Sequence, residues 1–381
     1  MSHLPALAAA LLLLLPAGQA AAQPVAVAPL AAPDAFSTAG RATGLPPNLW
    51  RGASAATART VLPLLASKPL SPAAAALARR VLATGAPGPE GAEPALVGAR
   101  AAALLAAGDA KAAADVLERA PGLDRNAEVS RAAAETALLT GDDARACAVA
   151  EALTVGREET YWLRLRAYCQ AIAGQEAQAQ LTFDLAQAQA RDAVYGRLMT
   201  AKLAGSGNPG AASLRNGLDY ALSRNLGLDL TGVTAVPAVA AARVEGDPAE
   251  PTWETAADLA GDPLDALLAA DGDAKVKARA QSAALLLASL AGPLSPERLG
   301  QVAAISLPEG KAGAGRNLAL DAAADQKLMG QTALLALWTS AEAGAAGPAL
   351  GDRARIIRAL RAVGLEADAR NFAQEGLAAL K

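Results

Sequence analysis

Four glycines stand at a fixed spacing in the chain, each 33 residues from the next: Gly108, Gly141, Gly174 and Gly207. Small residues repeat in register with the first three of them. Alanine occurs seven positions before each glycine and again five positions after it, at Ala101, Ala134, Ala167, Ala113, Ala146 and Ala179. A period of 33 residues with columns of small side chains is typical of stacked helical hairpins. The glycine of each unit is expected to end the first helix in the left-handed conformation, and the alanines to lie where helices touch.

The N-terminal region has the pattern of an export signal. An apolar run centred on Leu11–Leu15 is followed by Pro16 and by small residues up to Ala22, which predicts a signal peptide over 1–22. The rival interpretation is an uncleaved membrane anchor, although the run is short of the roughly 20 residues that a span needs. A disordered Ala/Pro-rich tether is expected over 23–40. We therefore expect a periplasmic protein with no membrane span after signal cleavage.

The rest of the chain divides at Pro- and Gly-rich stretches. A helical segment is expected over 41–84, a Pro/Gly hinge over 85–94, repeats over 95–225 and a C-terminal helical repeat region over 226–381. The fourth unit is degenerate, and Pro209 is expected to start its second helix. Residues 322–343 predict one long helix, whereas the glycine-rich stretch 310–315 predicts a flexible connector. No run of alternating β-branched residues occurs, so strands should be negligible.

The composition removes most catalytic chemistry. The single histidine, His3, falls inside the predicted signal peptide. The mature chain therefore has no histidine base, no Ser-His-Asp triad and no ordinary zinc site. No phosphate-binding loop motif is present, and the net charge of −3 gives no strong field for nucleic acid. We expect no cofactor, no metal and no nucleic-acid partner.

The two cysteines fall on neighbouring predicted helices. Cys147 lies on the second helix of one hairpin and Cys169 on the first helix of the next. In an exported protein such a pair is a disulfide candidate. The alternative is two buried small apolar side chains, and the spacing alone does not decide between them.

The units 108–120, 141–153 and 174–186 resemble the second half of tetratricopeptide repeats, in the glycine turn and in the small residues five and twelve positions later. The chain departs from that pattern because it lacks most of the usual aromatic partners and the closing proline. The resemblance implies an all-α fold, a right-handed α-solenoid of antiparallel helical hairpins, and binding of protein partners. As a whole the chain also resembles an exported protein type of alphaproteobacteria, which implies no mechanism.

Two groups of arginines and one tyrosine are candidate partner contacts. Tyr161, Arg164 and Arg166 share a predicted helix with Trp162 and Tyr168, and aromatic residues with arginine are typical of binding hot spots. Arg131 is expected to join them in a concave groove. The C-terminal hairpin adds further candidates, Arg355 and Arg358. The alternative is that the aromatic residues form the hairpin core and that the arginines line solvated helix faces.

These features of the sequence are compatible with two functions. The first is an exported scaffold that binds a protein partner in the bacterial cell envelope and performs no catalysis. The second is a peptidoglycan- or glycan-acting enzyme built on a helical superhelix. The sequence lacks a compact catalytic segment with a Glu-Ser pair and glycine-rich surroundings, which favours the scaffold.

Overall fold

The computed structural model describes residues 34, 36–93, 95–118, 120, 122–243, 251, 263–307 and 310–380. The predicted signal peptide and most of the predicted tether lie outside these residues. The end of the tether is described, and it packs. Phe36 is fully buried with its ring edge against Trp50, and Gly40 lies against Ala112. The packed part of the chain therefore begins by Phe36.

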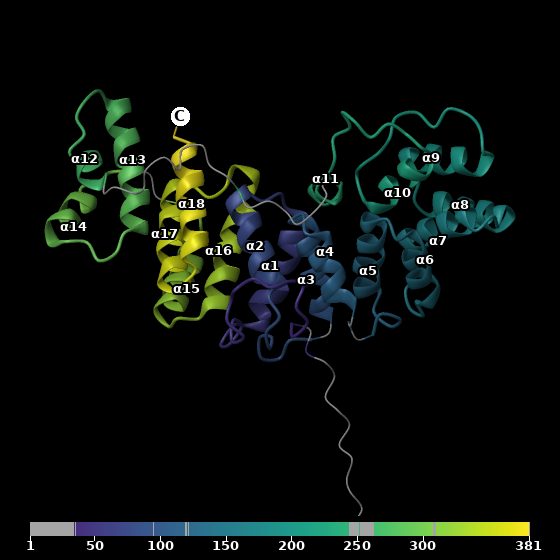
Figure 1. Cartoon of the computed structure of the whole chain (residues 1–381), viewed down its shortest axis with the longest axis horizontal. Helices are drawn as coiled ribbons and strands as arrows, with labels where there is room; N and C mark the ends of the chain where they lie inside the picture. The colour runs from purple at the N-terminus through teal and green to yellow at the C-terminus, as the bar shows by residue number, and fades with distance from the viewer. Residues whose placement is uncertain are drawn as a thin grey trace, which may run out of the picture. The chain divides into compact units, whose positions relative to one another are not determined.

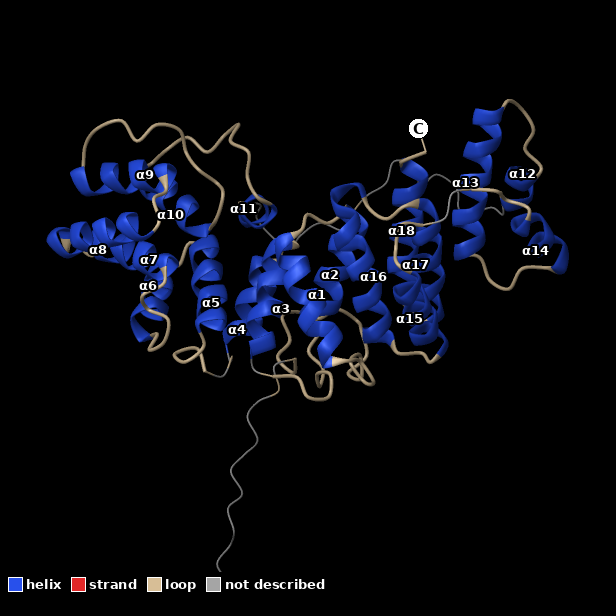
Figure 2. Ribbon diagram, turned by 180° about the vertical axis from the view of Figure 1, so that it is seen from behind, coloured by secondary structure: helices blue, strands red, loops and turns tan. Residues whose placement is uncertain are grey.

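The fold is all-helical, as the sequence predicts. Helices make up 65% of the described residues, which form no strand (Figure 2). A pair of helices precedes the repeats: α1 (Ala55–Ser67) and α2 (Pro72–Ala83). The repeat region holds eight helices: α3 (Ala95–Ala106), α4 (Ala110–Glu118), α5 (Ala127–Thr140), α6 (Asp143–Ala152), α7 (Thr160–Ile172), α8 (Glu176–Gln189), α9 (Ala193–Ala204) and α10 (Gly217–Asn225).

Among the described residues, eight α-helices and a short 3-10 helix (Gly344–Ala346) follow the repeats. The α-helices are α11 (Pro237–Ala242), α12 (Leu264–Leu268), α13 (Ala274–Leu290), α14 (Pro296–Ala303), α15 (Ala314–Asp325), α16 (Met329–Ala343), α17 (Leu350–Ala362) and α18 (Glu366–Ala378).

The repeat register is visible in the turns and in the contacts. Gly108, Gly141 and Gly174 have φ of 89°, 84° and 73°, the left-handed conformation expected of them. All six alanines of the repeating columns are fully buried: Ala101, Ala113, Ala134, Ala146, Ala167 and Ala179. Small side chains at these positions let consecutive helices approach closely.

The fourth unit differs from its prediction. Its second helix, α10, starts at Gly217 and not at Pro209. The carbonyls of Pro209 and Ala211 accept hydrogen bonds from the Arg197 guanidinium. Asn216 caps this helix, because its side chain accepts a hydrogen bond of 2.8 Å from the backbone N–H of Asp219.

The prediction of one helix over 322–343 is also wrong, because this stretch is divided between two helices, α15 and α16. Lys327 takes a φ of 58°, which non-glycine residues rarely adopt. Two tertiary contacts accompany the break. The Lys327 ammonium donates to the carbonyl of Ala362 at 2.9 Å, and the backbone N–H of Gly330 donates to the carbonyl of Leu49 at 2.9 Å.

The order of the helices in space differs from their order in the chain. Helix α1 packs on α3 on one side and on α16 on the other, and α2 packs on α16 and α18 (Figure 1). The first two helices therefore lie between the repeats and the C-terminal helices. Helix α11 returns to the repeats and contacts α3, α4 and α5. This return builds the wall of a pocket.

Candidate functional site: two pockets on the repeat helices

The larger pocket lies where α3, α5, α11 and the start of α10 meet, and we call it the α3–α5 pocket. Its volume is about 430 Å³. Its walls are mostly small or aliphatic, and α1 contributes to them as well. The residues are Pro63 and Ala66 of α1, Gly98, Ala99, Ala102, Leu105 and Ala106 of α3, Ala132 and Leu139 of α5, Gly217 of α10, and Ala238 and Val239 of α11. Cavities of this size and lining are typical of binding sites.

Close approach of two backbones shapes this pocket. A side chain at Gly98 would meet the backbone of Val129 at 3.0 Å, so α3 and the start of α5 touch directly. A side chain at Gly217 would meet the Glu135 carboxylate at 2.7 Å. Glycine at both positions therefore allows the packing that brings α10 and α3 to the two sides of α5.

Charged groups line the same pocket. The Glu135 carboxylate accepts a hydrogen bond of 2.8 Å from the backbone N–H of Gly217. Burial raises the pKa of Glu135, although this N–H, the Tyr161 hydroxyl and the charge of Arg131 act in the opposite direction. The Arg131 guanidinium is centred 4.5 Å from the Tyr161 ring. Burial, followed by the neighbouring Glu135 charge, raises the pKa of Tyr161 well above its usual value.

Arg215, at the entrance to α10, also lines the pocket and is anchored by two carboxylates. Its Nε donates to Asp219 at 2.7 Å and its Nη2 to Asp192 at 3.1 Å. Asp192 in turn accepts the backbone N–H groups of Val194 and Tyr195 at the start of α9. The pocket therefore presents both signs of charge around apolar walls.

The second pocket surrounds the two cysteines, and we call it the disulfide pocket. Cys147 of α6 and Cys169 of α7 are joined by a disulfide, with their Cα atoms 5.5 Å apart. The pocket has a volume of about 280 Å³ and is lined by Cys147, Cys169, Glu151, Arg157, Arg166, Gln170, Ala173 and Gln175.

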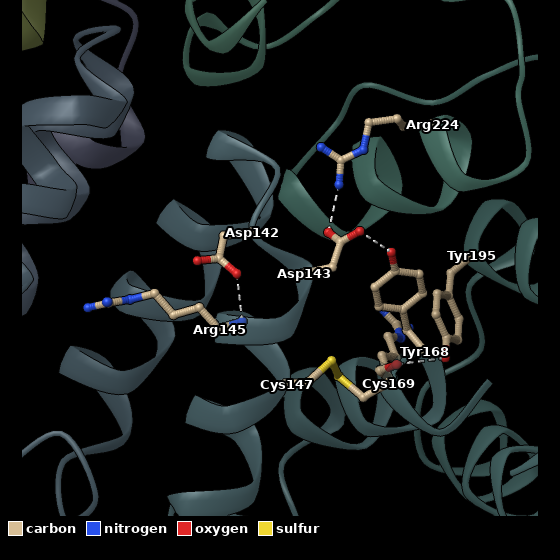
Figure 3. The surroundings of a disulfide bond; sticks show 9 residues. Asp142, Asp143, Arg145, Cys147, Tyr168, Cys169, Tyr195 and Arg224 are labelled. Atoms are coloured by element: carbon tan, nitrogen blue, oxygen red, sulfur yellow. Dashed lines mark hydrogen bonds and ion pairs between the residues drawn. A yellow bond between two sulfur atoms is a disulfide. The ribbon is translucent and has the colours of Figure 1, made fainter. Parts of the chain in front are cut away.

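A polar network lies beside the disulfide and joins three helices (Figure 3). The Tyr168 hydroxyl of α7 donates to Asp143 of α6 at 3.0 Å, and Arg224 of α10 donates to the other oxygen of Asp143 at 2.6 Å. Burial and the Asp143 charge raise the pKa of Tyr168. The network therefore orients α6, α7 and α10 without any contribution from the sulfur atoms.

The structure separates the predicted partner contacts. Arg131 lines the α3–α5 pocket, whereas Arg166 lines the disulfide pocket. Arg164 pairs with Asp192 at 3.4 Å, donates to the carbonyl of Ala190 and lies over the Tyr195 ring. The three arginines predicted to share one groove therefore have three different surroundings.

The remaining candidates are engaged within the chain. Arg355 and Arg358 of α17 both pair with Asp321 of α15. Trp162 and Tyr168 are buried in the core of the third hairpin, as the alternative interpretation has it. The glycine-rich stretch 310–315 is tied to α17, because the backbone N–H groups of Lys311 and Ala312 donate to Asp352.

Sequence reasoning missed Glu135, Arg215 and the α11 wall of the larger pocket. Glu135 and Gly217 are 82 positions apart, and no local pattern in the chain connects them. Sequence reasoning also missed Arg157 of the disulfide pocket. Its position between the two cysteines in the sequence was the signal that could have identified it.

No family model matches the chain, and neither a curated protein nor a solved structure matches it. In the part of the chain that the structure describes, no helix combines the length and the apolar character that crossing a bilayer requires.

Proposed function

We propose that the chain is an exported helical-repeat scaffold that binds a protein partner in the bacterial cell envelope and performs no catalysis itself. In this proposal the hairpins of 95–225 form a right-handed α-solenoid of the tetratricopeptide-like kind, and the partner presents a short segment to it. Periplasmic location follows from the N-terminal pattern.

The observation that carries the proposal is the α3–α5 pocket. Its apolar walls can cover the side chains of an inserted segment, since burial of apolar surface drives most protein association. Arg131 is exposed at the edge of these walls, and its guanidinium is already oriented over Tyr161. An oriented arginine loses little conformational freedom when it contacts a partner.

Site-specific photocrosslinking in envelope extract tests this proposal. A crosslinker at Ala102, inside the pocket, is expected to capture a discrete protein. A crosslinker at Ala177, which is exposed on α8, is the matched control and should not capture it. Arg131→Ala should reduce the yield at Ala102 several-fold, because hot-spot arginines typically contribute more than 1 kcal/mol.

Equal capture at both positions would contradict binding in the pocket. Release of soluble fragments when the purified chain is incubated with peptidoglycan would contradict a role without catalysis and would favour the glycan-acting alternative.

A further inference from the structure

The disulfide pocket has an unusual charge balance. Two guanidinium groups, from Arg157 and Arg166, line it together with one carboxylate, that of Glu151. Both cysteines are partly exposed, so reagents in solution have access to the bond. A disulfide that is only structural is commonly buried among apolar groups, whereas exposed and electropositive surroundings are typical of reactive cysteines.

Backbone carbonyls hold the two guanidinium groups in place. Arg157 donates to the carbonyls of Glu151 and Leu153 at 3.1 and 3.0 Å, and Arg166 donates to the carbonyl of Arg157 at 2.9 Å. Among the described residues, no ion pair involves either arginine. Burial, and after it repulsion from Arg157, lowers the pKa of Arg166.

Helices α6 and α7 are held together by other contacts besides the disulfide. Ala146 and Ala150 of α6 are buried in one apolar cluster with Trp162 and Leu165 of α7. The contacts of Asp143 with Tyr168 and Arg224 add a polar link between the helices. The helices can therefore stay together when the bond between the sulfurs opens.

We propose that the Cys147–Cys169 disulfide is a thiol-exchange site for a dithiol oxidoreductase, with Arg157 and Arg166 as the positioning residues that stabilise the thiolate leaving group. The proposal depends on the disulfide and its pocket alone, and not on the scaffold function.

The exchange proceeds in two balanced steps. A thiolate of the partner attacks one Sγ, forms a mixed disulfide and releases the other Sγ as a thiolate beside the guanidinium groups. The partner's second thiol loses its proton to water and attacks its own sulfur in the mixed disulfide, which releases the second cysteine of this chain. Two electrons pass from the dithiol to the disulfide, and the partner leaves oxidised.

The test measures the rate at which dithiothreitol reduces the full chain at pH 7, by alkylation of the released thiols and mass spectrometry. Arg166→Gln should slow reduction roughly three-fold or more, because a thiol of higher pKa is a poorer leaving group. Arg166→Lys keeps the charge and should retain most of the rate. The matched control is Arg145→Gln, since Arg145 lies on α6 two residues before Cys147 and points away from the sulfur pair (Figure 3).

A destabilised variant would be reduced faster, which is the opposite of the expected effect, so slower reduction cannot arise from loss of fold. The pH dependence of alkylation of the reduced chain gives a second measurement. At least one thiol should have a pKa clearly below the usual value of about 8.5 in the wild type and in Arg166→Lys, but not in Arg166→Gln. Equal reduction rates in Arg166→Gln and Arg145→Gln, or thiol pKa values that Arg166→Gln leaves unchanged, would overturn the proposal.

Discussion

At the scale of single residues, a buried arginine connects three parts of the fold. Arg100 of α3 is fully buried, and its guanidinium donates to the carbonyls of Leu82, Thr84 and Thr38 at 2.7–3.0 Å. Desolvation lowers its pKa to about 10, although the charge of Asp34 acts against this. The arginine thereby joins α3 to the segments on both sides of α1 and α2.

Arg100→Met is therefore expected to lower the free energy of unfolding by about 3 kcal/mol, because two buried carbonyls and one partly buried carbonyl lose a charged donor. Urea denaturation followed by circular dichroism measures this. Arg125→Met is the control, since the Arg125 side chain is 77% exposed and its loss should change stability by less than about 0.5 kcal/mol. Similar urea midpoints for the two variants would show that the three carbonyls accept other hydrogen bonds when Arg100 is replaced.

Glu135 provides a pH-dependent prediction. Its pKa is raised in the folded chain, so the folded state binds a proton more readily than the unfolded state does. Its contribution to stability therefore falls as pH rises through the folded pKa. Glu135→Gln cannot ionise yet keeps an acceptor for the Gly217 N–H, so its stability relative to wild type should be higher at pH 8 than at pH 4.

Unfolding of both proteins across that pH range measures the difference. Glu128→Gln is the control, because Glu128 lines the same pocket on the same helix but is exposed. If the stability of Glu135→Gln relative to wild type does not vary with pH, the Glu135 carboxylate is effectively solvated in the folded chain.

At the scale of helices, each repeat depends on a close contact between α-helices at its small-residue columns. Ala146 of α6 and Ala167 of α7 are fully buried at such contacts. Ala144 and Ala177 lie next to the turns, outside the columns, and are exposed. The same residue type thus occupies two very different environments within a few positions.

Ala146→Leu and Ala167→Leu are expected to destabilise the fold by about 1–3 kcal/mol each, since overpacking forces helices apart. Ala144→Leu and Ala177→Leu should cost far less. Thermal melts of the four variants measure this difference in stability. Identical melting temperatures for column and turn variants would refute the 33-residue register, and with it the tetratricopeptide-like interpretation.

At the scale of the whole molecule, the C-terminal helices complete the core around α1 and α2. Gly330 of α16 packs closely on the segment just before α1, because a side chain there would meet the carbonyl of Leu49 at 2.7 Å and the ring of Trp50 at 2.8 Å. Ile356, Ile357 and Phe372 of α17 and α18 belong to the same buried cluster as Trp50 and Leu62. The two ends of the described chain therefore stabilise each other.

Gly330→Ala should lower stability by about 1–3 kcal/mol, because backbone and a buried ring must move to admit one methyl group. Gly300→Ala is the control. Gly300 lies within α14 with no atom near its would-be side chain, so alanine should be neutral or stabilising there by up to about 1 kcal/mol. Equal stability of Gly330→Ala and wild type would show that α16 is only loosely held against Trp50.

The sequence by itself determined the helical class, the positions of the repeat turns and the buried alanine columns. These features are local: a glycine ends a helix where it stands, and a period of 33 residues places the same face inward in each unit. The partner arginines could not be assigned in this way. Asp192 and Asp321, which pair with three of them, lie 28 to 37 positions away.

Only the tertiary structure decided which helices are neighbours. Helix α16 contacts α1, and Glu135 contacts Gly217, although these segments are remote in the chain. The break at Lys327 likewise depends on contacts with remote segments. Each of these contacts forms because the apolar faces of all the helices are buried together. The stabilisation is a sum over many weak contacts, which cannot be read from any single segment of the sequence. For that reason the α3–α5 pocket, with one wall from α11, exists only in the folded chain.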